Sequence, residues 1–171
     1  KEDWRRAAKV YRKAISLKPE EPSAYCNLGA VLNNSLHRVE AAKWCLEATE
    51  RYPVGSEGWA EATARVFEML MQEDCSEVAK PEWWNDEGLK ALSVRVVRAA
   101  PMKAGVNNMR ATVLRGPING AWDARLRSAA ELREAATYYE RAAALHPAPA
   151  LKVKLIKIAY WCRSQAVAGS M

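Results

Sequence analysis

Apolar residues recur along the chain at helical spacing, and the pattern of residues 7–25 returns 34 residues later. Small, aromatic and proline positions coincide when the sequence is shifted by that period: Ala7, Tyr11, Ala14 and Pro19 return as Ala41, Cys45, Ala48 and Pro53, and Tyr25 returns as Trp59. A period of this length is typical of repeats built from helix pairs. Because stacked helix pairs form an extended concave surface, the pattern predicts a binding scaffold.

The second repeat, residues 22–53, has the most complete pattern. Its defining positions are Tyr25, Leu28, Gly29, Leu32, Ala41, Cys45 and Pro53. This motif resembles the tetratricopeptide repeat family, although Leu32 and Cys45 stand where that family prefers aromatic residues. The resemblance implies an all-α, right-handed αα superhelix. Gly29 and Ala41 are small where two antiparallel helices would cross closely, and Pro53 would end the second helix.

The same register predicts a single tetratricopeptide-like domain over residues 1–171. Its parts are a half-motif at 3–19, a motif at 22–53, irregular motifs at 56–101 and 104–147, and a C-terminal capping helix at 150–165. Pro101 follows Pro53 by 48 residues rather than 34, which indicates an insertion around 72–86. A second insertion is marked by the helix breakers Gly116, Pro117, Asn119 and Gly120.

Further repeat positions are expected to pack between helices. They are Ala48, Trp59, Ala135, Tyr139, Ala142 and Pro147. Ser128 and Glu131 have the spacing of a capping box at the start of the last motif's second helix. In the capping helix, an apolar run is expected to pack on the preceding pair while lysines keep part of the other face wet. The run is Val153, Ile156 and Tyr160, and the lysines are Lys152, Lys154 and Lys157.

Charge is distributed unevenly. The formal net charge is +6, and the whole excess lies in residues 86–171. This half contains a basic group: Arg95, Arg98, Lys103, Arg110, Arg115, Arg125, Arg127 and Arg133. Such a group is commonly a solvated helical face, and otherwise it could meet an acidic protein surface or a nucleic-acid backbone. Nucleic acid is the less favoured ligand, because the group lacks interleaved aromatic residues for base stacking.

The first helices of the motifs are expected to line the concave surface. The groove candidates are Asn27, Ala30, Asn33, Ala64, Phe67, Asn108, Thr112 and Arg115, beside Ser23, Cys26 and Ala60. This surface is mildly apolar and then basic, which suits a peptide with apolar anchors and an acidic end. Some tetratricopeptide domains clamp a C-terminal carboxylate of chaperones. Cys26 and Ala30 cannot bind one, and Asn27 alone matches a common family residue, so that mode is disfavoured.

Tryptophan is unusually frequent, with seven Trp against one Phe. Trp4, Trp44, Trp59 and Trp161 fall on expected helices and are interpreted as packing residues. Trp83 and Trp84 follow Pro81 in the first insertion, and Trp122 lies in the second. These three either pin the insertions onto the domain or form an interaction hot spot.

No catalytic or cofactor motif stands out, so neither enzymatic activity nor a cofactor is expected. His37 and His146 lack a paired nucleophile, and the four cysteines do not have metal-ligand spacing. No apolar run is long enough for a membrane span. The cysteines are expected to be reduced and structural, which favours an intracellular compartment, cytoplasmic by default. An organelle is the alternative if an upstream targeting segment is missing.

The expected function is therefore that of a protein–protein interaction scaffold or assembly module, with a peptide or protein surface bound in the groove. Two alternatives remain. One is a structural subunit docked permanently in a larger complex through apolar residues at the N-terminal end, for example Trp4, Val10 and Tyr11. The other is an RNA-binding helical repeat that uses the Arg-rich half.

Overall fold

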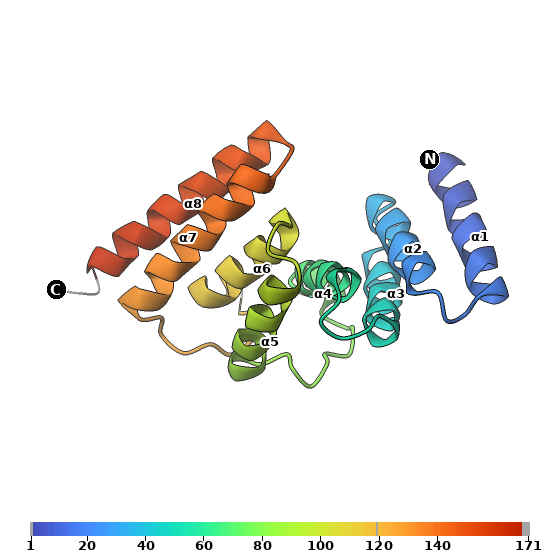
Figure 1. Cartoon of the computed structure of the whole chain (residues 1–171), viewed down its shortest axis with the longest axis horizontal. Coiled ribbons are helices and arrows are strands. Elements are labelled where there is room, and N and C mark those ends of the chain that lie inside the picture. Colours follow the sequence, from blue (N-terminus) through green and yellow to red (C-terminus); the bar gives the residue numbers. More distant parts are fainter. Residues whose placement is uncertain (1, 119, 169–171) are drawn as a thin grey trace. The chain divides into compact units, whose positions relative to one another are not determined.

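The computed structural model describes residues 2–118 and 120–168, and within them every regular element is helical (Figure 1). The α-helices are α1 (Glu2–Leu17), α2 (Pro22–Asn34), α3 (Arg38–Arg51), α4 (Glu57–Leu70), α5 (Asp86–Ala99), α6 (Ala104–Arg115), α7 (Ala129–Leu145) and α8 (Pro149–Ala168). A short 3₁₀ helix, η1 (Glu73–Cys75), follows α4. The all-α prediction is confirmed. Asn119, one of the predicted breakers, lies outside the described residues.

The chain divides into two compact units, residues 1–80 and 81–171. The first contains α1 to α4 and η1, and the second contains α5 to α8. The two helices of the predicted motif at 56–101, α4 and α5, therefore fall in different units. The single domain over the whole length stays a prediction, and each unit is described below by itself.

In the first unit, α2 and α3 form the pair predicted at 22–53. Helix α1 packs on α2, and α4 packs on α3. Gly29 is needed at the crossing of α2 and α3. A Cβ at this position would overlap Cys45 Sγ and lie 3.1 Å from the Ala41 carbonyl oxygen. The Tyr25 ring packs at 5.8 Å from that of Trp44, and its hydroxyl donates to the Pro19 carbonyl at 2.8 Å.

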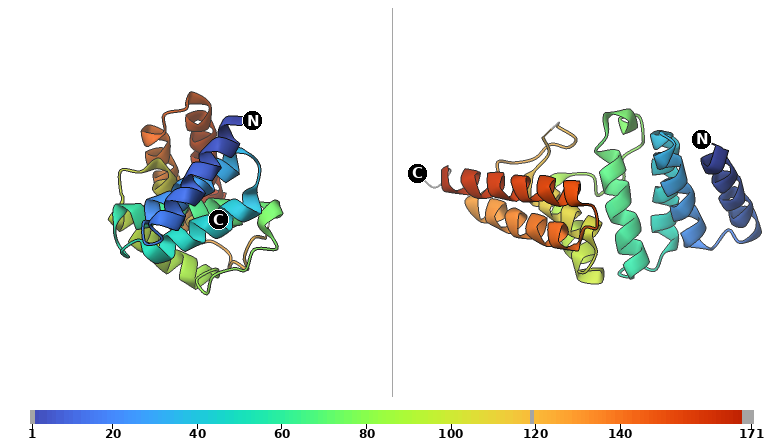
Figure 2. Two further views of the ribbon diagram at one scale, coloured as in Figure 1. Left: turned by 90° about the vertical axis from the view of Figure 1, so that its right-hand side faces the viewer. Right: turned by 90° about the horizontal axis from the view of Figure 1, so that it is seen from above.

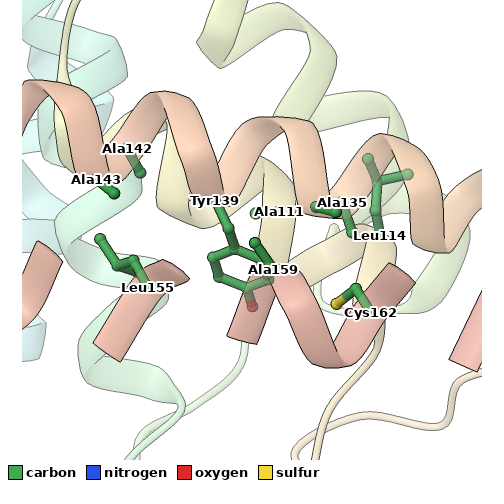
Figure 3. Packing of buried hydrophobic residues seen from close by; sticks show 10 residues of the cluster. Ala111, Leu114, Ala135, Tyr139, Ala142, Ala143, Leu155, Ala159 and Cys162 are labelled. Atoms are coloured by element: carbon green, nitrogen blue, oxygen red, sulfur yellow. The ribbon is translucent and has the colours of Figure 1, made fainter. Parts of the chain in front are cut away.

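The second unit is built around α7, which packs against α6 and α8. Figure 2 shows α7 and α8 lying side by side along most of their length. The core between these helices is made mostly of alanines, with Leu114, Leu155 and the buried ring of Tyr139. Figure 3 shows this ring extending from α7 toward α8, beside Ala159. Ala135, Tyr139 and Ala142 are buried, at the repeat positions predicted for packing.

Helix starts follow local capping rules. Ser56 and Asn85 accept hydrogen bonds from the backbone N–H groups of Trp59 and Gly88. The predicted capping box is present: Ser128 Oγ accepts from the Glu131 N–H, and the Glu131 carboxylate accepts from the Ser128 N–H at 2.9 Å. Prolines predicted to end helices, Pro53 and Pro147, lie exposed just after α3 and α7.

One packing prediction is wrong. Helix α8 buries Leu155, Ala159, Cys162 and Ala166, which form a stripe one turn apart facing α7. The run that was expected to pack there points away: Val153 is 55%, Ile156 48% and Tyr160 75% exposed. Apolar residues lie on several sides of this helix, so sequence spacing alone could not decide which side meets α7.

Candidate protein-binding surfaces

The clearest polar hollow in the first unit lies between α2 and α4 and has a volume of about 400 Å³. Two predicted groove residues of α2, Ala30 and Asn33, line it. The other lining residues are Asn34, Arg38, Arg65, Glu68, Met69 and Gln72. Amide and guanidinium donors thus converge on one hollow, in a combination suited to carbonyl and carboxylate oxygens.

Arg65 is held in place by the predicted groove residue Cys26. Its Nη1 donates to the Cys26 carbonyl oxygen at 3.3 Å and contacts Cys26 Sγ at 3.1 Å. Burial raises the pKa of the Cys26 thiol, while the nearby Arg65 charge acts in the opposite direction. Arg38, at the edge of the same hollow, is paired with Asp74 at 2.7 Å. Arg65 is therefore a cation that is already positioned at this hollow by its contacts with Cys26.

The remaining groove candidates of the first unit lie differently. Asn27 is exposed on α2, and Ser23 is half-buried with its hydroxyl bonded to Glu21. On α4, Ala60, Ala64 and Phe67 are buried. These three α4 residues act in packing, so the accessible part of this surface comes from the α2 residues and from Arg65 and Glu68.

On α6 the three predicted groove residues are also partly used inside the second unit. Thr112 is buried and shares a 3.1 Å hydrogen bond with the Tyr139 hydroxyl. Arg115 is half-buried, with Nε donating to the Gly116 carbonyl at 3.2 Å and its guanidinium 5.8 Å from the Tyr139 ring centroid. Asn108 is half-buried. Only part of this helix face can meet a partner.

Two members of the predicted basic patch are built into the interior. Arg110 is buried, pairs with Glu134 at 2.9 Å and donates to Ser93 Oγ at 3.1 Å. The Arg127 side chain is 5% exposed and donates to both carboxylate oxygens of Asp86. Both guanidinium groups hold helices of the second unit together, and neither presents its charge to a ligand.

Asp86 is the centre of this internal network. It also accepts from Trp122 Nε1 at 3.2 Å, and Lys90 Nζ lies 3.2 Å from it. Burial alone would raise the pKa of Asp86, but the bonds from Arg127, Trp122 and Lys90 lower it to about 2. The segment after α6 is thus bound to the start of α5 by an ionised carboxylate.

The other basic residues remain on the surface. Arg95, Arg98, Arg125 and Arg133 are exposed, and Lys103 is half-buried at the start of α6. Arg125 pairs with Glu87 at 3.1 Å where both side chains are about four-fifths exposed, at 81% and 80%. Such an exposed pair contributes little to stability.

The tryptophans of the two insertions contact one another. Trp84 Nε1 donates to the Ala121 carbonyl at 2.8 Å, and its ring packs edge-on against Trp122 at 6.1 Å. Trp83 lies 5.8 Å from Trp84. These contacts favour the interpretation that the tryptophans pin the two connecting segments together within the second unit, because the rings are half-buried or buried there.

The N-terminal end of the first unit also has exposed apolar residues. Trp4 is 41% and Val10 63% exposed, and Tyr11 is half-buried. A hollow of about 580 Å³ between α1 and the turn after α2 is lined by Trp4, Arg12, His37 and Glu40, among others. Arg12 and Glu40 pair across it at 2.8 Å.

Sequence reasoning did not select Arg65 or Gln72. The repeat register placed Ala60, Ala64 and Phe67 on the concave side of α4, whereas the accessible polar side chains follow one residue later, at Glu61, Arg65 and Glu68. A shift of one residue is 100° around a helix, which exchanges a buried face for an exposed one. The charged residues spaced by three and four on α4 were the available signal.

Comparison with known proteins supports the repeat assignment. Residues 1–34 match the family model described as TPR repeat. The fold is similar to that in the crystal structure of MamA protein, with a TM-score of 0.58 and 16% identity over 97% of this chain and 78% of that one. A comparison with curated proteins gives no match. The prediction of a tetratricopeptide-like helical repeat protein is confirmed.

Helical repeats of this kind form extended surfaces for protein interaction. Within residues 2–118 and 120–168, no cluster of His, Cys, Asp and Glu has the arrangement of a metal site. In the same residues, no helix is both long and apolar enough to span a bilayer. Among these described residues, the four cysteines are buried and free, and burial raises the pKa of Cys45 to about 12.

Proposed function

We propose that this chain is a protein-interaction scaffold that binds a partner segment in the hollow between α2 and α4. The observation that carries the proposal is the convergence of Arg65, Asn33, Asn34 and Gln72 on one hollow. A partner carboxylate would pair with the guanidinium of Arg65, and the amides would bond its backbone. Hydrogen bonds to an ionised partner are the stronger ones, at roughly 1.5–3 kcal/mol each.

The fixed position of Arg65 supports this role. Two contacts to Cys26 already restrict its side chain, so binding a ligand costs less conformational entropy than it would for a free arginine. Ala30, which has a small side chain, also lines the hollow. The ligand that fits best is an extended or irregular segment with an acidic residue, consistent with the acidic end expected from the sequence.

A site-specific photo-crosslinker tests this proposal. Placed at Glu68, at the rim of the hollow, it is expected to capture a protein from native lysate; placed at Glu50, exposed on α3, it should not. Arg65→Gln should abolish the product at Glu68 while the helical circular dichroism and thermal midpoint stay close to those of the parent. Identical products from both positions, or a product indifferent to Arg65→Gln, would contradict the proposal.

The same capture, repeated with added nuclease and at raised salt, distinguishes the two alternatives from the proposed scaffold. A scaffold complex should survive nuclease. Recovery of RNA that is lost steeply as salt rises would favour the RNA-binding alternative, because counterion release dominates phosphate contacts. A complex that resists high salt and depends on Trp4 rather than Arg65 would favour permanent docking through the N-terminal end.

A further inference from the structure

An exposed hydroxyl group, that of Ser128, lies at the end of the segment that leads into α7. Residues 123–128 form neither a helix nor a turn. Ser128 has an extended backbone, with φ −70° and ψ 157°, and is exposed. Leu126, two residues earlier, is 100% exposed. This segment therefore presents both a hydroxyl group and extended backbone to an enzyme that acts on exposed chain.

An arginine precedes this serine at a distance that kinases recognise. Arg125 lies three residues before Ser128, and its side chain is 81% exposed. Its ion pair with Glu87 is exposed on both sides, and such a pair costs little to open. Many serine kinases require an arginine three residues before the hydroxyl group, and charge patterns of this kind set their specificity. Arg125 therefore meets the requirement of an arginine-directed kinase.

The other serines with a basic residue at the same distance are placed differently. Lys13 precedes Ser16 by three residues, and Lys90 precedes Ser93. Ser93 is buried, at 0% exposure. Ser16 lies inside α1, where its hydroxyl donates to the Lys13 carbonyl at 2.8 Å. A kinase can extend a helical segment only after that segment has unfolded locally. The fold thus favours Ser128 over the other serines with this spacing.

The Ser128 hydroxyl lies beside groups that attract negative charge. Ser128 Oγ and the Ser128 N–H both donate to one oxygen of the Glu131 carboxylate, at 3.0 and 2.9 Å. Lys90 Nζ pairs with the other oxygen of this carboxylate at 2.6 Å. A phosphate on Ser128 would replace the carboxylate at the start of α7, where the helix dipole and the Lys90 ammonium both favour an anion. Glu131, whose side chain is 25% exposed, would then turn toward solvent.

We propose that Ser128 is a phosphorylation site for a serine kinase that recognises Arg125. In this reaction Ser128 Oγ forms a bond to the γ-phosphorus of ATP, and the bond from that phosphorus to the bridging oxygen breaks. ADP leaves, and the hydroxyl proton passes to a base of the kinase. The phosphate adds about two negative charges at pH 7 and exchanges the capping box for a phosphate cap. No residue of the hollow between α2 and α4 takes part.

Phosphorylation of the folded chain tests this proposal. The whole chain is incubated with ATP and activated calmodulin-dependent kinase II, which requires one arginine at this distance, and mass spectrometry assigns the modified residue. We expect phosphate on Ser128. The rate should fall by about tenfold or more in Arg125→Ala and stay unchanged in Arg133→Ala, an exposed arginine within α7. Absence of phosphate on Ser128 in the folded chain would overturn the proposal, whether or not a peptide of residues 120–133 is modified.

The variant Lys13→Arg separates the effect of the fold from that of the sequence motif. It gives Ser16 an arginine at the same distance, but inside α1. A peptide of residues 8–20 with this change should be modified on Ser16. The folded variant should be modified on Ser128 and not on Ser16. Modification of both serines at equal rates in the folded variant would contradict the argument that the extended segment selects Ser128.

Phosphorus NMR tests whether the phosphate caps α7. A phosphate bound by helix N–H groups and Lys90 should lose its second proton at a lower pH than the same group in the peptide, where that pKa is about 6. Lys90→Gln should raise the titration midpoint toward that of the peptide, whereas Lys152→Gln, in α8, should not. Equal midpoints in the folded chain and the peptide would overturn the phosphate cap.

Discussion

At the scale of single residues, Gly29 lies where α2 and α3 cross closely. Gly29→Ala would gain helix propensity, by about 1 kcal/mol in an exposed helix. Here the new methyl group overlaps Cys45 Sγ and meets the Ala41 carbonyl at 3.1 Å, within a core where neighbours cannot give way. Overpacking of this kind costs about 1–3 kcal/mol, so we expect a net loss of stability in urea unfolding.

Two controls make the Gly29 prediction specific. Gly105, in the first turn of α6, has nothing within 4 Å of an added Cβ, so Gly105→Ala should be neutral or slightly stabilising. Cys45→Ala removes the sulfur that the new methyl group strikes. The double variant Gly29→Ala/Cys45→Ala should therefore lose less stability than the sum of the single variants. Additive losses would show that the crossing can relax around the methyl group.

Asp86 carries the second prediction at this scale. Its pKa is lowered to about 2 in the folded chain, against about 3.9 for an unfolded aspartate. The stabilisation is therefore fully present above about pH 4 and is lost as the pH falls through 2. It amounts to roughly 2–3 kcal/mol. Asp86→Asn should lower the free energy of unfolding at pH 7. In this variant the free energy should also fall less steeply below pH 4, because the asparagine side chain does not bind a proton. The measurement is urea unfolding at pH 7, 4 and 2.5.

The Asp86 variant also tests the buried partner. The Arg127 side chain is 5% exposed, and loss of its carboxylate leaves a buried cation that is poorly compensated. Asp86→Asn/Arg127→Leu should therefore recover part of the stability lost in Asp86→Asn. As a comparison, Glu87→Gln removes the exposed pair with Arg125 and should change the unfolding free energy by less than about 0.5 kcal/mol. An equal effect of the two carboxylates would contradict the buried network.

At the scale of helices, α7 begins at a local signal that can be removed. Ser128→Ala deletes the oxygen that accepts from the Glu131 N–H, and loss of such a cap costs about 1 kcal/mol. Ser164→Ala is the matched control, since Ser164 lies within α8 and bonds only the Tyr160 carbonyl of its own helix. Thermal unfolding should show a lower midpoint for Ser128→Ala and no decrease for Ser164→Ala.

The helices differ in how far sequence could predict them. The start of α7 follows from Ser128 and Glu131, three residues apart, and its end from Pro147, so both were readable. The face of α8 that stays exposed could not be predicted from the sequence. Apolar residues lie on several sides of this helix, and only its packing on α7 decides which side is buried. Polar contacts between residues far apart in the sequence were equally hidden. Arg127 reaches Asp86 over 41 residues, and Arg65 reaches Cys26 over 39. Such contacts depend on tertiary packing, and no local sequence pattern predicts them.

At the scale of the whole molecule, the boundary between the two units falls in the longest connection between α-helices, residues 71–85. The first part of this connection packs back onto α3 and α4 through η1, with Cys75 and Val78 buried. Its last part belongs to the second unit, where Trp84 bonds the Ala121 carbonyl. Each end is therefore anchored to its own unit: Lys80 Nζ donates to the Cys75 carbonyl at 2.8 Å, and the exposed Ala79 lies just before the boundary.

This arrangement predicts where a protease cleaves the folded chain first. Glu73, Glu77 and Glu82 are exposed in the connection, whereas the segment at 116–127 contains no Glu, and Glu20 lies in a short hydrogen-bonded turn. A Glu-specific protease under native conditions should therefore cut first between residues 73 and 82, because cleavage needs several residues of extended chain. Mass spectrometry of the early products identifies the bond. A first cut inside α2 to α4 or α5 to α8 would show that the division into two units does not describe how the molecule opens.

Glu77→Gln/Glu82→Gln should slow the first cut without moving it into a helix, since the remaining Glu73 lies in η1 and is held by the pairing of Asp74 with Arg38.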